Sequence, residues 1–176
     1  MISRKLLFKI VIVGDSGVGK STMVKRLITG KFLPQKLTIG TDLASFSIDI
    51  NEIKAILQLW DFAGEKKFRF FLPNYSRGAQ GCVLCYDLTR YDTFKNLKEW
   101  YDIVRKNAFD PVFVLVAEKH DLADSARVVS LEEGEKFRKK NNVAYFFETS
   151  SKSGNNVHTI FETLTRAIID KRNIKI

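Results

Sequence analysis

The chain of 176 residues lacks several features that would set it apart from ordinary globular proteins. No apolar stretch is long enough to span a bilayer, and the N-terminus carries neither an apolar signal segment nor a myristoylation glycine. The last four residues contain no cysteine for prenylation, so either a tail is missing from this sequence or the protein does not use that anchor. Internal repeats, low-complexity segments and linkers are also absent, and we expect one domain over residues 1–176.

Cysteine is scarce. The two cysteines, Cys82 and Cys85, lie in one apolar run. Such a C-x-x-C pair can serve redox or metal chemistry, but no second pair exists, and a strand here would bury both thiols. We therefore expect two structural thiols in a reducing, cytoplasmic protein, with peripheral attachment to membranes left open.

Positive charge is in excess, with 29 Lys and Arg against 20 Asp and Glu, for a net charge of +9. The basic residues are dispersed and no known nucleic-acid motif is present, so we expect no nucleic-acid partner. A solvated basic surface is the simplest interpretation. A patch facing an anionic membrane or an acidic partner is the alternative.

The stretch from Leu6 to Ser21 organises the chain. Its first half is an apolar run that predicts a buried strand, and its second half, from Gly14, reads G-x-x-x-x-G-K-S. A helix is expected behind it up to Thr29, closed by Gly30. Glycines let the backbone N–H groups of such a loop surround phosphate oxygens, and the helix directs its positive end to the same anion. The sequence therefore predicts a phosphate-binding loop, in which Lys20 reaches the outer phosphates and Ser21 reaches Mg²⁺.

Strands and helices alternate along the rest of the chain. Residues 42–50 and 54–60 predict a hairpin, and 79–87, 112–117 and 143–147 predict three further strands. Helices are predicted at 92–108, from a capping box at Ser130 and Glu133, and at the end of the chain. This alternation predicts a doubly wound α/β sheet, in which ligands bind at the carboxyl ends of the strands.

Polar residues follow three of these strands. Asp61 comes directly after a strand, where it can reach Mg²⁺, and Gly64 can offer its N–H to a terminal phosphate. Lys119 and Asp121 follow the strand at 112–117. The Asp121 carboxylate can accept from guanine N1 and N2, a donor pair that adenine lacks. Ser151-Lys152 follows the last strand and would hold the guanine carbonyl with backbone N–H groups.

Together these motifs identify the chain, over residues 6 to 172, as similar to the Ras-superfamily small GTPases, and within them to the Rab branch. Its motifs are Gly14-Asp15-Ser16-Gly17-Val18-Gly19-Lys20-Ser21, Thr38-Ile39-Gly40, Leu57-Gln58-Leu59-Trp60-Asp61, Tyr75-Ser76-Arg77-Gly78-Ala79, and Tyr86-Asp87-Leu88-Thr89 with Phe94-Lys95-Asn96-Leu97. The resemblance implies a single-domain P-loop GTPase fold with a six-stranded, mostly parallel sheet, one antiparallel edge strand and about five helices on both faces.

The resemblance also implies roles for individual residues. Those implied for catalysis are Lys20, Thr38, Gly64 and Glu65, and those implied for Mg²⁺ are Ser21, Thr38 and Asp61. Those implied for GTP or GDP are Asp15, Ser16, Gly17, Val18, Gly19, Lys20, Ser21, Thr22, Phe32, Thr38, Gly64, Lys119, Asp121, Ser150, Ser151 and Lys152. Residues 31–48 and 61–78 would contain the two switches and bind an exchange factor, a GTPase-activating protein and effectors of a monomeric protein. The Rab resemblance further implies a role in vesicle traffic.

Two departures from the family affect the chemistry. Glu65 stands where the family has the Gln that orients the attacking water, so we expect slow intrinsic hydrolysis. The alternatives are that Glu65 acts as a base through water or points to solvent. Glu118 replaces the Asn that donates toward guanine N7 and ties the base loop to the phosphate loop. Because ionised Glu is an acceptor only, we expect weaker nucleotide affinity, or a nearby cation such as Lys152 that compensates.

Further departures concern the switches. The stretch between Phe32 and Thr38 is shorter than the usual Rab spacing, so switch I would close differently. Phe62, in place of a small polar residue, is expected to add apolar surface to switch II. Three cations, Lys66, Lys67 and Arg69, are expected to make that face basic. No arginine within the chain is an obvious catalytic group, so we expect a partner to supply an arginine finger.

Three hypotheses follow for the function. The first is a switch that binds GTP or GDP with Mg²⁺ and hydrolyses GTP slowly. The second is a nucleotide-binding scaffold with little or no GTPase activity, which Glu65 and Glu118 favour. The third is a P-loop ATPase or nucleotide kinase, against which Asp121 and the lack of an arginine-rich lid argue.

Overall fold

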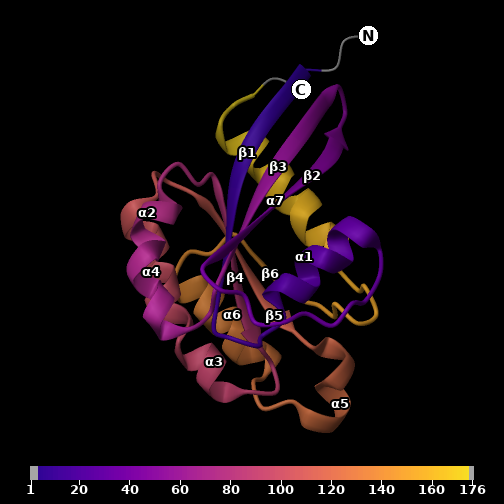
Figure 1. Cartoon of the computed structure of the whole chain (residues 1–176), viewed down its shortest axis with the longest axis vertical. Coiled ribbons are helices and arrows are strands. Elements are labelled where there is room, and N and C mark those ends of the chain that lie inside the picture. The colour runs from indigo at the N-terminus through magenta and orange to yellow at the C-terminus, as the bar shows by residue number, and fades with distance from the viewer. Residues whose placement is uncertain (1–3, 175–176) are drawn as a thin grey trace.

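The computed structural model describes residues 4–174 and contains a six-stranded sheet of order β2-β3-β1-β4-β5-β6 (Figure 1). The strands are β1 (Arg4–Val13), β2 (Thr41–Ile50), β3 (Ile53–Phe62), β4 (Gly81–Asp87), β5 (Val112–Glu118) and β6 (Tyr145–Glu148). Only the β2–β3 pair is antiparallel within this part of the chain, and the other four pairings are parallel. The predicted sheet, with one antiparallel edge strand, is thereby confirmed.

The burial of each strand reflects its place in the sheet. β4 and β5 each have a parallel neighbour on both sides and are buried at every residue, as parallel strands covered on both faces require. β2 lies at the edge, and only Ile48 and Ile50 of it are buried. Asn51, at the turn between β2 and β3, has a φ of 52°, a left-handed conformation that asparagine tolerates in a tight hairpin.

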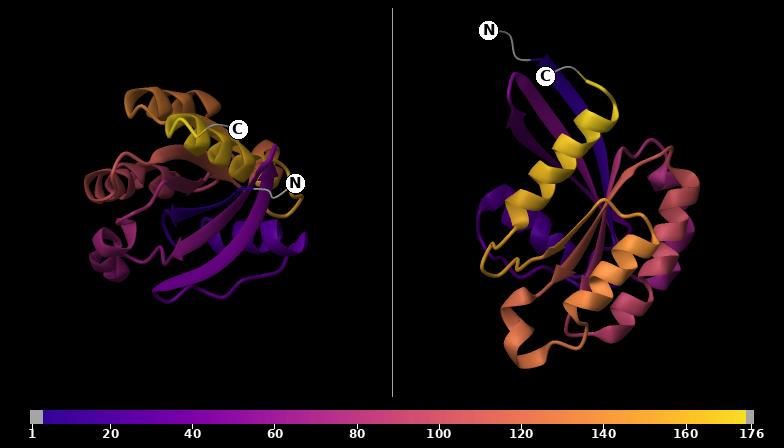
Figure 2. Two further views of the ribbon diagram at one scale, coloured as in Figure 1. Left: turned by 90° about the horizontal axis from the view of Figure 1, so that it is seen from above. Right: turned by 180° about the vertical axis from the view of Figure 1, so that it is seen from behind.

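The helices are α1 (Lys20–Thr29), α2 (Leu72–Ser76), α3 (Tyr91–Lys95), α4 (Leu97–Asn107), α5 (Ala123–Ala126), α6 (Leu131–Lys140) and α7 (Val157–Lys171), with two 3₁₀-helices, η1 (Lys66–Phe71) and η2 (His120–Leu122). One apolar core lies between the sheet and the pair α1 and α7, and a second lies between the sheet and α4 and α6. The right-hand view of Figure 2 shows α4 and α6 next to each other, away from α1. No helix among residues 4–174 combines the length and apolar character needed to cross a membrane.

Helix boundaries differ from the sequence prediction in two places. The single helix predicted at 92–108 is divided at Asn96, whose side-chain amide donates to Asp15 at 2.6 Å. The stretch from Asp61 to Gly78, predicted as irregular, contains η1 and α2. Pro73 lies in the first turn of α2, where a proline needs no N–H partner. A contact with a distant residue accompanies the break at Asn96, whereas a local residue, Pro73, suits the start of α2.

The two thiols lie on β4 and are fully buried, as the sequence predicts. Residues three apart in a strand point to opposite faces, and Cys82 and Cys85 accordingly belong to different cores. Burial raises the pKa of both thiols well above the ordinary value. This C-x-x-C pair is therefore a packing feature, without the geometry for redox or metal chemistry.

Candidate nucleotide-binding site

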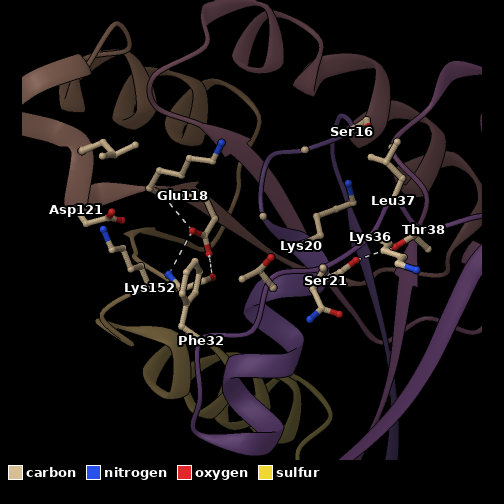
Figure 3. Close-up of a pocket in the computed structure, with 18 residues that line it drawn as sticks. Ser16, Lys20, Ser21, Phe32, Lys36, Leu37, Thr38, Glu118, Asp121 and Lys152 are labelled. Atoms are coloured by element: carbon tan, nitrogen blue, oxygen red, sulfur yellow. Dashed lines mark hydrogen bonds between the residues drawn. The ribbon is translucent and has the colours of Figure 1, made fainter.

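The carboxyl ends of β1, β3 and β5 and the loop after β6 meet around a cavity of about 510 Å³ (Figure 3). The cavity is lined by Ser16, Gly17, Gly19, Lys20, Ser21, Thr22, Phe32, Gln35, Lys36, Leu37, Thr38, Gly64, Glu118, Lys119, Asp121, Leu122, Ser151 and Lys152. Thirteen of these were predicted as site residues from the sequence. In Figure 3, Lys20, Ser21 and Thr38 lie at one end of the cavity, and Phe32, Asp121 and Lys152 lie at the other.

The loop from Gly14 to Gly19 connects β1 to α1 with the geometry of an anion site. Gly14 has a φ of 145°, and a Cβ there would lie 2.1 Å from the carbonyl oxygen of Cys85, so no other residue fits. Lys20 is 5% exposed, and its ammonium donates to the carbonyl oxygens of Gly14 at 2.7 Å and Asp15 at 2.9 Å. Burial lowers the pKa of Lys20. The first turn of α1 contains no acidic residue, so the loop and the helix terminus are free to receive phosphate.

Three side-chain oxygens form a candidate magnesium site beside Lys20. The hydroxyl of Ser21 donates to Asp61 Oδ2 and lies 2.8 Å from the hydroxyl of Thr38. Asp61 is 3% exposed, and its Oδ1 has no hydrogen-bond partner among the residues described. Burial raises the pKa of Asp61 to about 6. A buried carboxylate oxygen without a partner, next to two hydroxyls, suits a hard divalent cation.

Gly64 lines the cavity, and Glu65, the next residue, does not. A Cβ at Gly64 would lie 2.2 Å from the backbone nitrogen of Ser16, so only glycine allows this close contact between switch II and the phosphate loop. The Glu65 carboxylate is 2.9 Å from the ammonium of Lys67 and is not among the groups that line the cavity. Gly64 thus lines the cavity, whereas the carboxylate of Glu65 pairs with Lys67 outside the lining.

The other end of the cavity has the residues predicted to select guanine. Asp121 Oδ1 accepts from the hydroxyl of Ser150 at 2.7 Å, which orients the carboxylate, and both Asp121 and Lys152 line the cavity. Lys119 has a φ of 69° and forms an ion pair with Asp87, and this pair lowers the pKa of Asp87 despite its burial. The 46% exposed ring of Phe32 covers this end from switch I.

Glu118 lines the cavity between its two ends and is 1% exposed. Its carboxylate accepts from the backbone N–H of Lys119 at 3.0 Å and of Ser151 at 3.4 Å, and from the Ser151 hydroxyl. Burial raises its pKa to about 7. The expectation that Lys152 compensates its charge is wrong, because within residues 4–174 the partners of Glu118 are a hydroxyl and two N–H groups. Burial thus favours the protonated form of this carboxyl, a factor that the expectation of an acceptor-only carboxylate did not include.

Five predicted site residues do not line the cavity. The carboxylate of Asp15 accepts from Arg69, Asn96 and Trp100 instead. The other four are Val18, which is fully buried, Ser150, which supports Asp121, Asp61, which lies behind Ser21, and Glu65, which binds Lys67. Asp61 and Ser150 are therefore connected to the cavity lining by hydrogen bonds to Ser21 and Asp121.

Arg90 was not among the residues predicted for the site, since no arginine was an obvious catalytic group. Its guanidinium donates to the carbonyl oxygen of Ser16 at 2.9 Å and to Asp87 at 3.1 Å. Arg90 also lines a second cavity of about 460 Å³ on the far side of Ser16 and Gly64. Its place just after Tyr86-Asp87-Leu88-Thr89, at the end of a predicted strand, was the signal that could have indicated it. The lining residues Gln35, Lys36, Leu37 and Leu122 were likewise not predicted.

Two expectations about switch II are corrected. Phe62 is 1% exposed and packs against Tyr75 and Trp100, so it adds to the core and not to the surface. Arg69 is buried and paired with Asp15 and Glu99, so only Lys66 and Lys67 of the predicted basic face are exposed. The exposed apolar surface of this segment comes from Phe70, which is 82% exposed, and from Phe71.

A doubly wound sheet with a G-x-x-x-x-G-K-S loop between β1 and α1, beside a cavity that the carboxyl ends of the strands enclose, defines the class of P-loop proteins. A sequence model of the Ras family matches residues 9–170. The Ras-related protein SEC4 of Saccharomyces cerevisiae is 42% identical over 167 residues, which cover 94% of this chain and 76% of that protein. The Ras-related protein Rab-2B of Dictyostelium discoideum is 42% identical over 167 residues, or 94% and 82% of the two chains. The Ras-related protein RIC2 of Oryza sativa subsp. japonica is 39% identical over 175 residues, or 96% and 79%.

The chain therefore belongs to the Ras family of small GTPases, on its Rab branch. Members of this family are GTP-binding molecular switches. The family assignment rests on sequence comparison and not on the contacts described above, and it too indicates a guanine nucleotide as the ligand.

Proposed function

We propose that this protein is a guanine-nucleotide switch that binds GTP and GDP with Mg²⁺ and hydrolyses GTP slowly when unassisted. The carrying observation is that one cavity joins an anion loop at Lys20 to a carboxylate at Asp121. The Asp121 carboxylate, oriented by Ser150, suits the N1 and N2 donors of guanine. Adenine offers no such pair of donors, which favours GTP over ATP.

The candidate metal ligands are Ser21, Thr38 and Asp61, whose oxygens lie together beside the phosphate end. A divalent cation held there would neutralise charge that develops on the transferred phosphoryl group. Lys20 and the backbone N–H groups of the phosphate loop act on the same charge. Loss of the γ-phosphate would free Thr38 and Gly64, so both switches would relax.

Slow hydrolysis follows from the chemistry of Glu65. A carboxylate cannot donate to the transition-state oxygens and is repelled by the γ-phosphate, whereas the usual Gln orients the attacking water. The contact of Glu65 with Lys67 also holds the side chain outside the cavity lining. An activating partner would therefore have to stabilise the transition state, and an arginine finger is one group that does so.

A second candidate function is a nucleotide-binding scaffold with little or no GTPase activity, and the Glu65–Lys67 contact favours it. In either case the partners would be an exchange factor, an activating protein and effectors that bind residues 31–48 and 61–78 of a monomer. The exposed Leu37, Ile39 and Phe70 give these segments an apolar surface for binding. Membership of the Rab branch supports a role in vesicle traffic, in the cytoplasm or peripherally on membranes.

The first test identifies the nucleotide released from the purified, denatured protein by ion-exchange chromatography. GDP supports a switch that completes hydrolysis, GTP supports the scaffold, and an adenine nucleotide overturns both. The second test measures single-turnover hydrolysis of GTP by the wild type and by Glu65→Gln.

We expect Glu65→Gln to raise the rate by roughly tenfold or more, because an amide restores the donor that positions water. Lys67→Ala is the matched control, because it frees Glu65 without giving it a donor. An unchanged rate in Glu65→Gln would contradict the role given to Glu65. A rate restored by Lys67→Ala alone would assign the slow turnover to the ion pair instead.

A further inference from the structure

Glu118 is a buried carboxyl where the base loop meets the phosphate loop. A Cβ on Gly19 would lie 3.2 Å from Glu118 Cδ, so the two loops are in direct contact at this point. Figure 3 shows the Glu118 carboxyl between Phe32 and Lys20, with hydrogen bonds to its own loop and to the loop that carries Lys152. The charged groups and hydrogen-bond partners around this carboxyl decide which protonation state it adopts.

The groups around Glu118 favour a neutral carboxyl. Asp121 on the same loop is the acidic group whose charge opposes ionisation of Glu118, and the Cys85 thiol on β4 is neutral. The cations of the neighbouring elements are directed elsewhere, since Lys119 pairs with Asp87 and Lys20 donates to backbone carbonyls. In the part of the chain that the structure describes, no ion pair joins Glu118 to a cation. Burial without a counter-charge disfavours the ionised form.

The hydrogen bonds indicate which oxygen carries the proton. Oε2 accepts from two backbone N–H groups, those of Lys119 and Ser151, which occupy both of its lone pairs. Oε1 has the Ser151 hydroxyl as its protein partner. A proton on Oε1 can therefore point into the cavity while the Ser151 hydroxyl donates to the remaining lone pair of that oxygen.

Guanine presents a matching edge. If Asp121 holds N1 and N2, the opposite edge of the base carries N7 and O6, which are both acceptors. An ionised carboxylate facing that edge would be repelled, because its oxygens and the N7 and O6 atoms are all acceptors. A protonated carboxyl would instead donate a hydrogen bond, as the Asn usual at this position does.

We propose that Glu118 binds guanine nucleotides in its protonated form, donating from Oε1 to N7 of the base, and that Ser151 is the positioning residue that fixes Oε1. This inference rests on the guanine binding proposed above. Binding of GDP then takes up a proton. Retention of the nucleotide depends on pH through a residue that ordinary members of the family do not have.

The direction of the effect follows from linkage. The nucleotide-free protein has a Glu118 pKa of about 7, and an acceptor at N7 raises that pKa further in the complex. Affinity is therefore highest below the free pKa and is lost progressively as pH rises through it. Other groups that titrate in this range, including the phosphates of GDP, are shared by wild type and variants and cancel in their comparison.

The experiment measures GDP binding by calorimetry from about pH 6 to about pH 8.5, in two buffers of different ionisation heat, which counts the protons taken up. The proteins are the wild type, Glu118→Gln and Ser151→Ala, with Glu118→Asn as a second neutral variant if Glu118→Gln does not fold. The second ligand is 7-deaza-GDP, which lacks the N7 acceptor.

Relative to Glu118→Gln, we expect the GDP affinity of the wild type to fall by about tenfold from the lowest to the highest pH. As Glu118 loses its proton, its hydrogen bond to N7 is replaced by repulsion between the carboxylate and the N7 lone pair. The difference should vanish with 7-deaza-GDP. In the wild type the Ser151 hydroxyl stabilises the ionised carboxylate and so lowers the pKa of Glu118. Ser151→Ala removes this hydroxyl and should therefore move the midpoint of the pH dependence to higher pH. A role of Ser151 in packing alone would leave the midpoint unmoved.

Three results would overturn the inference. The first is the same pH profile for wild type and Glu118→Gln with GDP, and the second is the same profile for GDP and 7-deaza-GDP with wild type. The third is an unmoved midpoint in Ser151→Ala, which removes its positioning role. A folded wild type that binds no GDP at any pH would overturn the proposed function itself, so the two failures are distinguishable.

Discussion

The guanidinium of Arg69 donates to the carboxylate of Asp15, in the loop from Gly14 to Gly19, at 3.0 Å. The same guanidinium pairs with Glu99 and lies 4.3 Å from the centre of the Trp100 ring. Switch II, the phosphate loop and α4 are thereby joined at one buried point. Asp15 and Gly64 are thus two separate points at which the 61–78 segment contacts the loop from Gly14 to Gly19.

Replacing Arg69 by Ala should destabilise the protein by about 3 kcal/mol, because it leaves Asp15 partly buried without its counter-charge. The free energy of unfolding, from urea titration of the GDP-bound protein, measures the loss. Lys67→Ala is the matched control on the same 3₁₀-helix, where an exposed ion pair is expected to contribute less than about 1 kcal/mol. Equal losses of unfolding free energy in both variants would show that the Arg69–Asp15 contact stabilises the protein no more than an exposed ion pair does.

Replacing Arg90 by Ala should accelerate GDP release by roughly tenfold, because Arg90 links the Ser16 carbonyl to Asp87 and so to Lys119. Loss of a fluorescent GDP analogue, followed by stopped flow, gives the rate. The neighbouring Tyr91→Phe removes only an exposed hydrogen bond to Glu133 and should leave the rate unchanged. An Arg90→Ala rate equal to that of Tyr91→Phe would refute the link.

Replacing Phe62 by Thr should cost about 3 kcal/mol of stability, because a fully buried ring in contact with Tyr75 and Trp100 is lost and a cavity is left. Thermal and urea unfolding measure the change. Phe70→Ala, which removes an 82% exposed ring, should change stability by less than about 0.5 kcal/mol. The reverse order of the two losses would place Phe62 at the surface.

Replacing Glu118 by Gln should change how the stability of the nucleotide-free protein depends on pH. Burial raises the pKa of Glu118 from 4.5 to about 7, so the folded protein retains a proton that the unfolded chain releases. Glu118 therefore destabilises the fold progressively as pH rises between these two values and by a constant amount above them. Between these two pH values, the free energy of unfolding of Glu118→Gln should rise by roughly 3 kcal/mol relative to that of the wild type. Urea unfolding at each pH measures this difference. Parallel curves would show that Glu118 is ionised when buried.

The family resemblance and the order of elements were available from the sequence because they rest on local patterns. The G-x-x-x-x-G-K-S run at Gly14, the apolar runs of β4 and β5 and the capping box at Ser130 and Glu133 each lie within a few residues. Parallel strands place their carboxyl ends at one edge, so the approach of Asp121 to the phosphate loop could also be inferred.

Only the tertiary structure decided which side chains meet around the site. Trp100 reaches Asp15 across 85 positions, and Ser151 reaches Glu118 across 33. Composition and periodicity determine which face of an element is apolar, but not which polar partner a distant loop brings to it. A buried polar group must be satisfied wherever a partner is found, and that partner is set by the packing of the whole chain.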